Sequence, residues 1–288
     1  VKGVKIINNY QVPNQSGTYN STTPCTFEQM VADQGGNPTL ALQHIDVTAG
    51  DKVYVQVAGN DFTGLDLRIS EQPNSWSLAG DFSYAANPNG PWTYGGVSVD
   101  GLGNPSISAF TLVQSNIWPG DFGPGQDQWS SGSHMGMMKG AGGAITVDLP
   151  AGRCAGHALT GVRWTAPKEL PVKLVGASWK LRNNDAAFIS VWIKGVKVID
   201  HYQVPNQSPT YNSTTPCTFD KMITDQGGSA ATLQNISVVF GDEIYVQVYG
   251  NDFTGLDVAI TEMPSSWSLS GDFSYAANPN GPWTYGGV

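Results

Sequence analysis

Residues 188–199 read FISVWIKGVKVI, two β-rich runs on either side of Lys194-Gly195. Short runs rich in valine and isoleucine are typical of strands, and a tight connection ending in glycine is typical of a β-hairpin. Any division of the chain into domains therefore has to keep this hairpin whole.

An internal repeat surrounds the hairpin. The run GDFSYAANPNGPWTYGGV at residues 80–97 is identical to residues 271–288, which lie 191 positions later. The run YQVPNQS at 10–16 recurs at 202–208, an offset of 192, so one residue has been deleted near Asn37. Self-similarity at a fixed period indicates a repeat architecture. The 288 residues hold about one and a half copies of a unit of about 191 residues.

The looser segments EQPNSWS at 71–77 and EMPSSWS at 262–268 are the best boundaries, because a division near residue 193 would cut the hairpin. This places the C-terminal part of one unit at 1–72, a complete unit at 73–263 and the N-terminal strands of a further unit at 264–288.

Composition and pattern predict an all-β fold. Only 13% of the residues are charged, and 35 glycines and 18 prolines punctuate the chain. Short β-branched and aromatic runs occupy residues 53–57, 107–113, 162–165, 172–175 and 244–248. Strands at this spacing predict jelly-roll-like antiparallel β-sandwich units. No apolar run approaches the ~18 residues of a membrane span.

One short helix per unit is expected, the first at residues 26–33. Thr26 and Gln29 fit a capping box, and Gly35-Gly36 would end the helix.

The partial units at both ends predict assembly. Half a sandwich leaves a sheet edge unpaired and an apolar face uncovered. Either the chain belongs to a longer array, or neighbouring chains complete each other by strand addition. The alternative is that the half-units fold alone as small sandwiches.

Four motifs resemble a known domain. They are DFSYAANPNGPWTY at 81–94, VRWTAP at 162–167, VWIKG at 191–195, and Gly241-Asp242 followed by TGLD at 254–257. In this order they resemble a β-sandwich domain of bacterial exosortase-sorted (PEP-CTERM-type) secreted proteins and related extracellular surface proteins. The resemblance implies an extracellular matrix, cell-surface or carbohydrate-associated role, and it carries over no catalytic residues. The His-Pro-Gly that often precedes the family's central strand is replaced here by the run AGHA at 155–158.

The three cysteines follow the repeat. Cys25 and Cys217 occupy the same position in two copies, and Cys154 is the third. The simplest pairing is a disulfide between Cys154 and Cys217, with Cys25 bound to a partner outside the chain, in an oxidising compartment. The alternative is three buried thiols.

Nothing in the sequence predicts an enzyme. The four histidines, His44, His134, His157 and His201, are scattered, and a G-x-S-x-G nucleophile elbow is absent. His201 corresponds to Asn9 in the other copy, so that position does not require imidazole.

Calcium is the candidate cofactor. The carboxylates that lie among asparagine and glycine are Asp51, Asp61 and Asp66, repeated as Asp242, Asp252 and Asp257. Calcium binds six to eight such oxygens. The alternative is that these residues are solvated and end strands.

Tryptophans offer a second kind of site, because a flat ring can stack on a sugar. Trp92 and Trp283 follow Asn-Gly-Pro turns, and Trp118 and Trp129 flank a Gly/Pro-rich loop, so these four are the contact candidates. Trp164, Trp179 and Trp192 lie inside β-rich runs and are predicted to be core residues.

Charge is unevenly distributed. Residues 139–197 hold nine of the 14 basic residues and three of the 23 acidic ones. This asymmetry suits end-to-side docking of like subunits, or else a lysine-fringed face that keeps strands soluble. The net charge of −9 argues against nucleic acid as a partner.

These observations predict an extracellular structural or adhesive protein that assembles head to tail with itself. The alternative is a carbohydrate-binding module of a secreted or cell-surface assembly, with polysaccharide as the partner.

Overall fold

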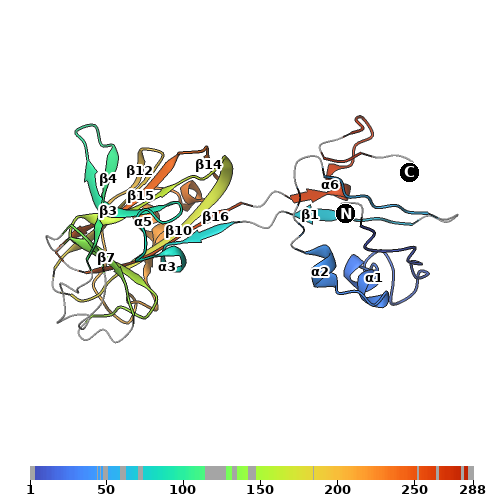
Figure 1. The fold of residues 1–288 in the computed structure, drawn as a ribbon, viewed down its shortest axis with the longest axis horizontal. Coiled ribbons are helices and arrows are strands. Elements are labelled where there is room, and N and C mark those ends of the chain that lie inside the picture. Colours follow the sequence, from blue (N-terminus) through green and yellow to red (C-terminus); the bar gives the residue numbers. More distant parts are fainter. Residues whose placement is uncertain are drawn as a thin grey trace. The chain divides into compact units, whose positions relative to one another are not determined.

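A computed structural model of the chain describes residues 4–43, 45, 47, 51–58, 63–70, 74–113, 128–131, 135–141, 147–183, 185–251, 253–263, 266–279 and 282–284 (Figure 1). The chain divides into two compact units. Residues 73–263 form one, here called the complete unit, and residues 1–72 together with 264–288 form the other, the split unit. The divisions fall at the boundaries placed from the repeat. The two end segments were expected to belong to different units, but here they lie together in one.

The complete unit is an all-β sandwich of two antiparallel sheets, as predicted. Within the described residues, one sheet has the order β13-β10-β16-β8-β7-β6-β5, with β14 also paired to β10 and β2 to β16. The second sheet has the order β12-β11-β15-β9-β3-β4. The strands of the first sheet are β2 (Ser75–Ser77), β5 (Thr111–Val113), β6 (Gln128–Ser130), β7 (Gly136–Lys139), β8 (Cys154–His157), β10 (Leu170–Lys180), β13 (Cys217–Thr218), β14 (Ile236–Val238) and β16 (Thr254–Glu262). Those of the second are β3 (Trp92–Val99), β4 (Pro105–Ala109), β9 (Thr160–Thr165), β11 (Ala187–Ile193), β12 (Val196–Gln203) and β15 (Glu243–Gly250).

The predicted hairpin is confirmed. Strands β11 and β12 pair antiparallel, with Ile193 opposite Val196. The connection Lys194-Gly195 has φ of 53° and 78°, the left-handed conformation that a two-residue hairpin turn requires. This hairpin forms the edge of the six-stranded sheet.

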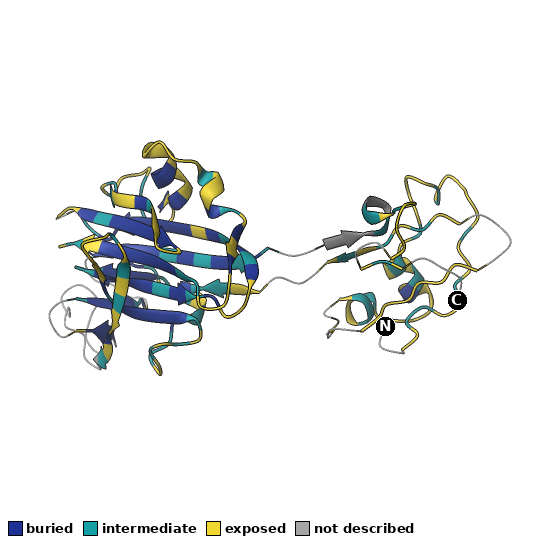
Figure 2. Cartoon of the chain, turned by 90° about the horizontal axis from the view of Figure 1, so that it is seen from above, coloured by how far each residue is buried: buried dark blue, intermediate teal, exposed yellow. Residues whose placement is uncertain are grey.

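The core lies between the two sheets because alternate residues of each strand point inward. In β15, Ile244, Val246 and Val248 face the core, which leaves Tyr245, Gln247 and Tyr249 on the outer face. Trp164, Trp179 and Trp192 are buried, as predicted for core residues. In Figure 2 the strands of the complete unit are mostly dark blue, the colour of buried residues.

Short helices occur in both units. The complete unit contains α3 (Leu78–Asp81), α5 (Phe219–Asp225) and the 3-10 helix η1 (Ala230–Leu233), and the split unit contains α1 (Phe27–Asp33), α2 (Pro38–Leu42) and α6 (Leu269–Asp272). Thr26 caps α1, as predicted, by accepting from the Gln29 backbone N–H at 3.2 Å. The Gln29 side chain donates to Asp33. None of the described helices has the length and apolar character needed to cross a membrane.

The split unit holds a two-stranded sheet, in which β1 (Arg68–Ser70) pairs with β17 (Ser266–Ser268). The predicted strand at residues 53–57 is wrong for this unit, because these residues adopt no regular structure and are exposed. Their copy, residues 244–248, forms most of β15 and lies between β11 and β9. Of the strands that the structure describes in the split unit, β1 and β17, neither pairs with this run.

Candidate functional site

Each unit is closed by a pair of strands from its two ends, here called the closure pair. In the complete unit β2 pairs with β16, with Trp76 opposite Ile260. In the split unit β1 pairs with β17, with Ile69 opposite Trp267. A shift of 191 positions converts one set of partners into the other, so both closures have the same register. The end segments of a unit therefore pair in the same way whether or not its middle strands are present.

Glu262 reinforces the closure pair of the complete unit. Its Oε2 accepts from the backbone N–H of Asn74 at 3.2 Å and from the Asn74 side chain at 2.5 Å, and its Oε1 accepts from Lys168 Nζ at 2.8 Å. Burial alone would raise the pKa of Glu262, but the hydrogen bonds from Lys168 and Asn74 outweigh it and hold the pKa below its ordinary value. The carboxylate therefore remains charged and ties the first strand of the unit to the last.

The outer face of the six-stranded sheet carries a second candidate site, here called the outer groove. It is a hollow of about 400 Å³ between β3 and the strands β11, β12 and β15. Its lining includes Ser98 from β3, Ser190 and Trp192 from β11, Lys197, Asp200 and His201 from β12, and Gln247 and Tyr249 from β15. This volume falls in the range of small-ligand pockets, 300–1,000 Å³.

Hydrogen bonds fix the floor of the outer groove. Gln247 Nε2 donates to the carbonyl of Val97 at 2.9 Å, and Trp192 Nε1 donates to the carbonyl of Gly103 at 3.2 Å. The Lys197 ammonium lies 5.2 Å from the centre of the Trp192 ring and 2.8 Å from Asp200 Oδ1. The β3–β4 connection is thereby held across the outer face of the sheet.

Three aromatic rings gather at the end of the outer groove, one from each of three neighbouring strands. Phe188 and His201 are nearly parallel, with ring centres 4.2 Å apart. Tyr249 lies 5.3 Å from His201 and 6.1 Å from Phe188, and 46% of its surface is exposed. The exposed rings of His201 and Tyr249, at the end of a polar hollow, form a surface suited to a flat ligand.

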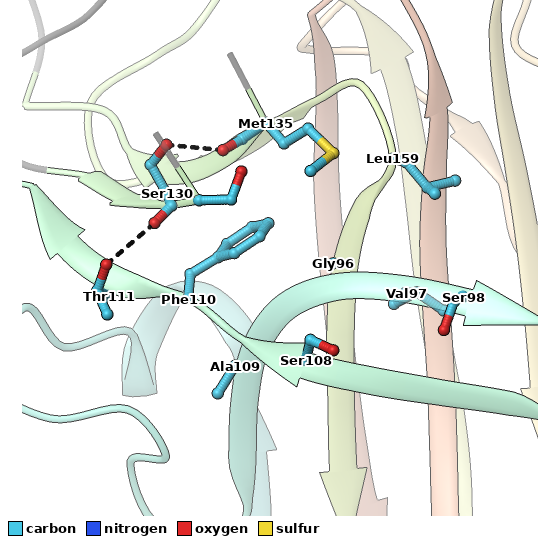
Figure 3. Close-up of a pocket in the computed structure, with 11 residues that line it drawn as sticks. Gly96, Val97, Ser98, Ser108, Ala109, Phe110, Thr111, Ser130, Met135 and Leu159 are labelled. Atoms are coloured by element: carbon cyan, nitrogen blue, oxygen red, sulfur yellow. Dashed lines mark hydrogen bonds between the residues drawn. The ribbon is translucent and has the colours of Figure 1, made fainter. Parts of the chain in front are cut away.

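A neighbouring hollow of about 430 Å³ shares Val97, Ser98 and Leu159 with the outer groove. Figure 3 shows Phe110 projecting into it, beside Ser130, whose hydroxyl donates to the carbonyl of Met135 at 2.8 Å.

Two of the tryptophans predicted to contact a ligand, Trp92 and Trp129, line neither hollow. Trp92 is 1% exposed and donates from Nε1 to Asp81, and Trp129 is buried and donates to the carbonyl of Ser83. The prediction was wrong for these two, because both rings are packed in the core of the complete unit. Trp283 is half-buried and donates to Asp272, and Trp118 lies outside the described residues.

The predicted disulfide between Cys154 and Cys217 is not formed, and all three cysteines are free thiols. Cys154 pairs with Leu256, Leu256 with Ser178, and Ser178 with Cys217, so the cysteines lie on one row of the sheet with two strands between them. Three strand spacings amount to roughly 14 Å. A disulfide needs Cα atoms within about 7 Å. The partner expected for Cys25 outside the chain remains a prediction.

The candidate calcium ligands that the structure describes are engaged elsewhere. Asp257 forms a two-pronged ion pair with Arg153, and Asp242 lies 3.0 Å from Lys194 and accepts from the Val239 backbone N–H at 2.9 Å. Burial raises the pKa of Asp257, and Arg153 offsets this only in part. The described Asp51 and Asp66 are exposed, whereas Asp61 and Asp252 lie outside the described residues. Among the described residues, no three His, Cys, Asp or Glu side chains come together as a metal site.

The charge asymmetry is resolved within the complete unit. Five cations of the basic segment pair with carboxylates that follow it in the chain: Arg153 with Asp257, Arg163 with Glu243, Lys168 with Glu262, Lys194 with Asp242, and Lys197 with Asp200. Four of these pairs join segments far apart in sequence, and Lys197 pairs with Asp200 of its own strand, so these five cations are balanced within the complete unit. Docking between subunits stays a prediction.

Two features of these sites were missed by sequence reasoning. The closure pair could have been found from the echo of EQPNSWS and EMPSSWS, because the echoed segments provide both strands. The aromatic cluster could not, because Phe188 and Tyr249 come together only when β11 pairs with β15.

Comparison with models of known protein families and with curated proteins gives no match to this chain.

Proposed function

We propose that the chain is an extracellular structural or adhesive repeat protein that assembles head to tail. The single observation that carries this proposal is the common register of the two closure pairs. The strands of the β1–β17 pair come from opposite ends of the chain, and residues 73–263 lie between them.

Strand exchange supplies the mechanism. The end segment 264–288 of one copy can replace that of another copy on β1, because the paired residues are the same in both cases. Such an exchange is a heterologous contact, which builds open-ended polymers when it does not close into a ring. Within one chain, the linking segment raises the effective concentration of β17 and favours the closed form, so assembly should increase with protein concentration.

Incomplete units support further association. The 288 residues contain two N-terminal segments (73–97 and 264–288), two C-terminal segments (1–72 and 193–263) and one middle segment (98–192). The run at 53–57 is exposed and adopts no regular structure, so its backbone groups are available for β-strand addition by another copy.

The extracellular location is part of the same proposal. It rests on the low charged fraction and on the resemblance to secreted bacterial β-sandwich domains. A disulfide no longer supports it, since the cysteines of the structure are free.

Sedimentation velocity over a range of protein concentrations, with electron microscopy of the same samples, tests the proposal. We expect higher oligomers or filaments that increase with concentration. Ile69→Pro should reduce them, because proline removes a backbone donor from β1. Leu40→Ala, at an exposed residue of α2, is the control and should assemble normally. A monomer at every concentration, or unchanged assembly of Ile69→Pro, would contradict strand exchange.

A further inference from the structure

We infer that the outer groove binds a neutral polysaccharide, with the exposed faces of His201 and Tyr249 as the stacking platform. This binding site is independent of head-to-tail assembly, because every residue that forms it belongs to the complete unit.

The platform has the chemistry that a sugar ring needs. One face of a pyranose carries C–H groups, which pack on aromatic rings, and its edge carries hydroxyls, which need hydrogen-bond partners. The exposed rings of His201 and Tyr249 supply the surface for the C–H groups, and Phe188 supports His201 by stacking on its other face. Lys197 and Asp200, both exposed, line the adjoining hollow and supply a donor and an acceptor for the hydroxyls.

Charge favours a neutral ligand. Lys197 and Asp200 pair with each other at 2.8 Å, so they add no net charge to the groove. The whole chain carries −9, which would repel an anionic polysaccharide.

The repeat indicates that the fold does not require this platform. Tyr249 corresponds to Ala58 in the other copy and His201 to Asn9, although the preceding run YVQV is the same in both. Asn9 and His201 have the same φ of 48°, so asparagine accepts the backbone conformation at this position. The two rings are therefore features of the complete unit's surface, and the chain itself offers the substitutions that remove them.

Native gel electrophoresis of the full chain tests the site, in gels that contain hydroxyethyl cellulose, dextran or galactomannan, with dextran sulfate as the charged comparison. We expect at least one neutral polysaccharide to retard the protein. The double substitution Tyr249→Ala with His201→Asn should weaken this binding about tenfold or more, the size expected for loss of a stacking contact. His201→Asn alone, whose counterpart already occurs in the chain, should give a smaller loss.

Phe240→Ala is the matched control. Phe240 is 79% exposed, precedes the opposite end of β15 and corresponds to Ala49 in the other copy. We expect this variant to bind as the unaltered chain does. Three results would overturn the inference: no retardation by any neutral polysaccharide, retardation by dextran sulfate alone, or equal weakening by Phe240→Ala. Thermal melting of each variant separates loss of binding from loss of folding.

Discussion

The two units contain nearly the same run of residues in opposite surroundings. IYVQV at 244–248 lies inside a sheet, and its Tyr245 is 4% exposed. VYVQV at 53–57 pairs with none of the strands that the structure describes, and its Tyr54 is 70% exposed. A valine-rich alternating run is therefore not sufficient to form a strand. The neighbours β9 and β11 provide the hydrogen bonds and cover that make it one.

Local contacts, in contrast, are the same in both units. Tyr10 donates to Asp33 in the split unit as Tyr202 donates to Asp225 in the complete unit. Thr26 and Thr218 cap equivalent helices by accepting from backbone N–H groups at the same distance, 3.2 Å. Contacts within about 25 residues thus form without the middle segment, and only the long-range sheet depends on it.

Adding a middle segment to the split unit should make the run at 53–57 form a strand, as its copy does in the complete unit. If residues 73–192 are joined in front of Val1, the segment 1–72 continues a complete unit, because Val1 corresponds to Ile193. We expect the backbone amides of 53–57 to become protected from hydrogen exchange by several kcal/mol, the scale of a folded domain. Exchange of these amides within seconds in the extended chain would show that the run does not form a strand even with its neighbours present.

The same substitution at equivalent positions should cost much more stability in the complete unit than in the split unit. Phe219 is fully buried against Gly176, whereas its copy Phe27 is half-exposed. We expect Phe219→Ala to lower the free energy of unfolding by about 3–5 kcal/mol. Phe27→Ala should lower it by less than about 1 kcal/mol. Urea unfolding followed by tryptophan fluorescence measures both, and similar losses would mean that α1 is packed as tightly as α5.

The rate of cysteine alkylation should also differ between the two copies of the repeat. Burial raises the pKa of Cys217, and it raises that of Cys154 to about 12, whereas Cys25 is half-exposed. At pH 8 we expect Cys25 to react at least about a hundredfold faster than Cys217, equivalent to about 2.8 kcal/mol of protection. All three should react in denaturant without reductant. Mass spectrometry would detect a disulfide as a failure of two cysteines to label under those conditions.

The smallest expected effect concerns Asp242. The hydrogen bond from the Val239 backbone N–H, with help from Lys194, lowers the pKa of this carboxyl below its ordinary value. Because the folded-state pKa is the lower one, the stabilisation is present above about pH 4 and disappears as pH falls through the folded-state pKa. We expect Asp242→Asn to cost up to about 1 kcal/mol at pH 7 and almost nothing near pH 2, from urea unfolding at both values. If Asp242→Asn cost the same stability at pH 7 and pH 2, the loss would come from packing and not from the charge of the carboxylate.

The sequence was informative where structure is local. The hairpin at Lys194-Gly195, the capped helix after Thr26 and the burial of Trp164 followed from short-range patterns. Trp92 was misplaced because an Asn-Gly-Pro turn does not reveal which way the next ring points. The pairing of Cys154 with Cys217 failed because a cysteine count carries no strand order.

The closure pair also determines how a unit responds to tension. The chain enters the complete unit at β2 and leaves it at β16, with Ser75 opposite Thr261, so both ends lie at the same end of one antiparallel pair. A force that pulls these ends apart loads Asn74 and Glu262 first and then opens the cross-strand pairs one after another. Opening in series needs less force than shearing all pairs at once. A filament built from such units would therefore lengthen by releasing short strands while each sandwich core stays folded.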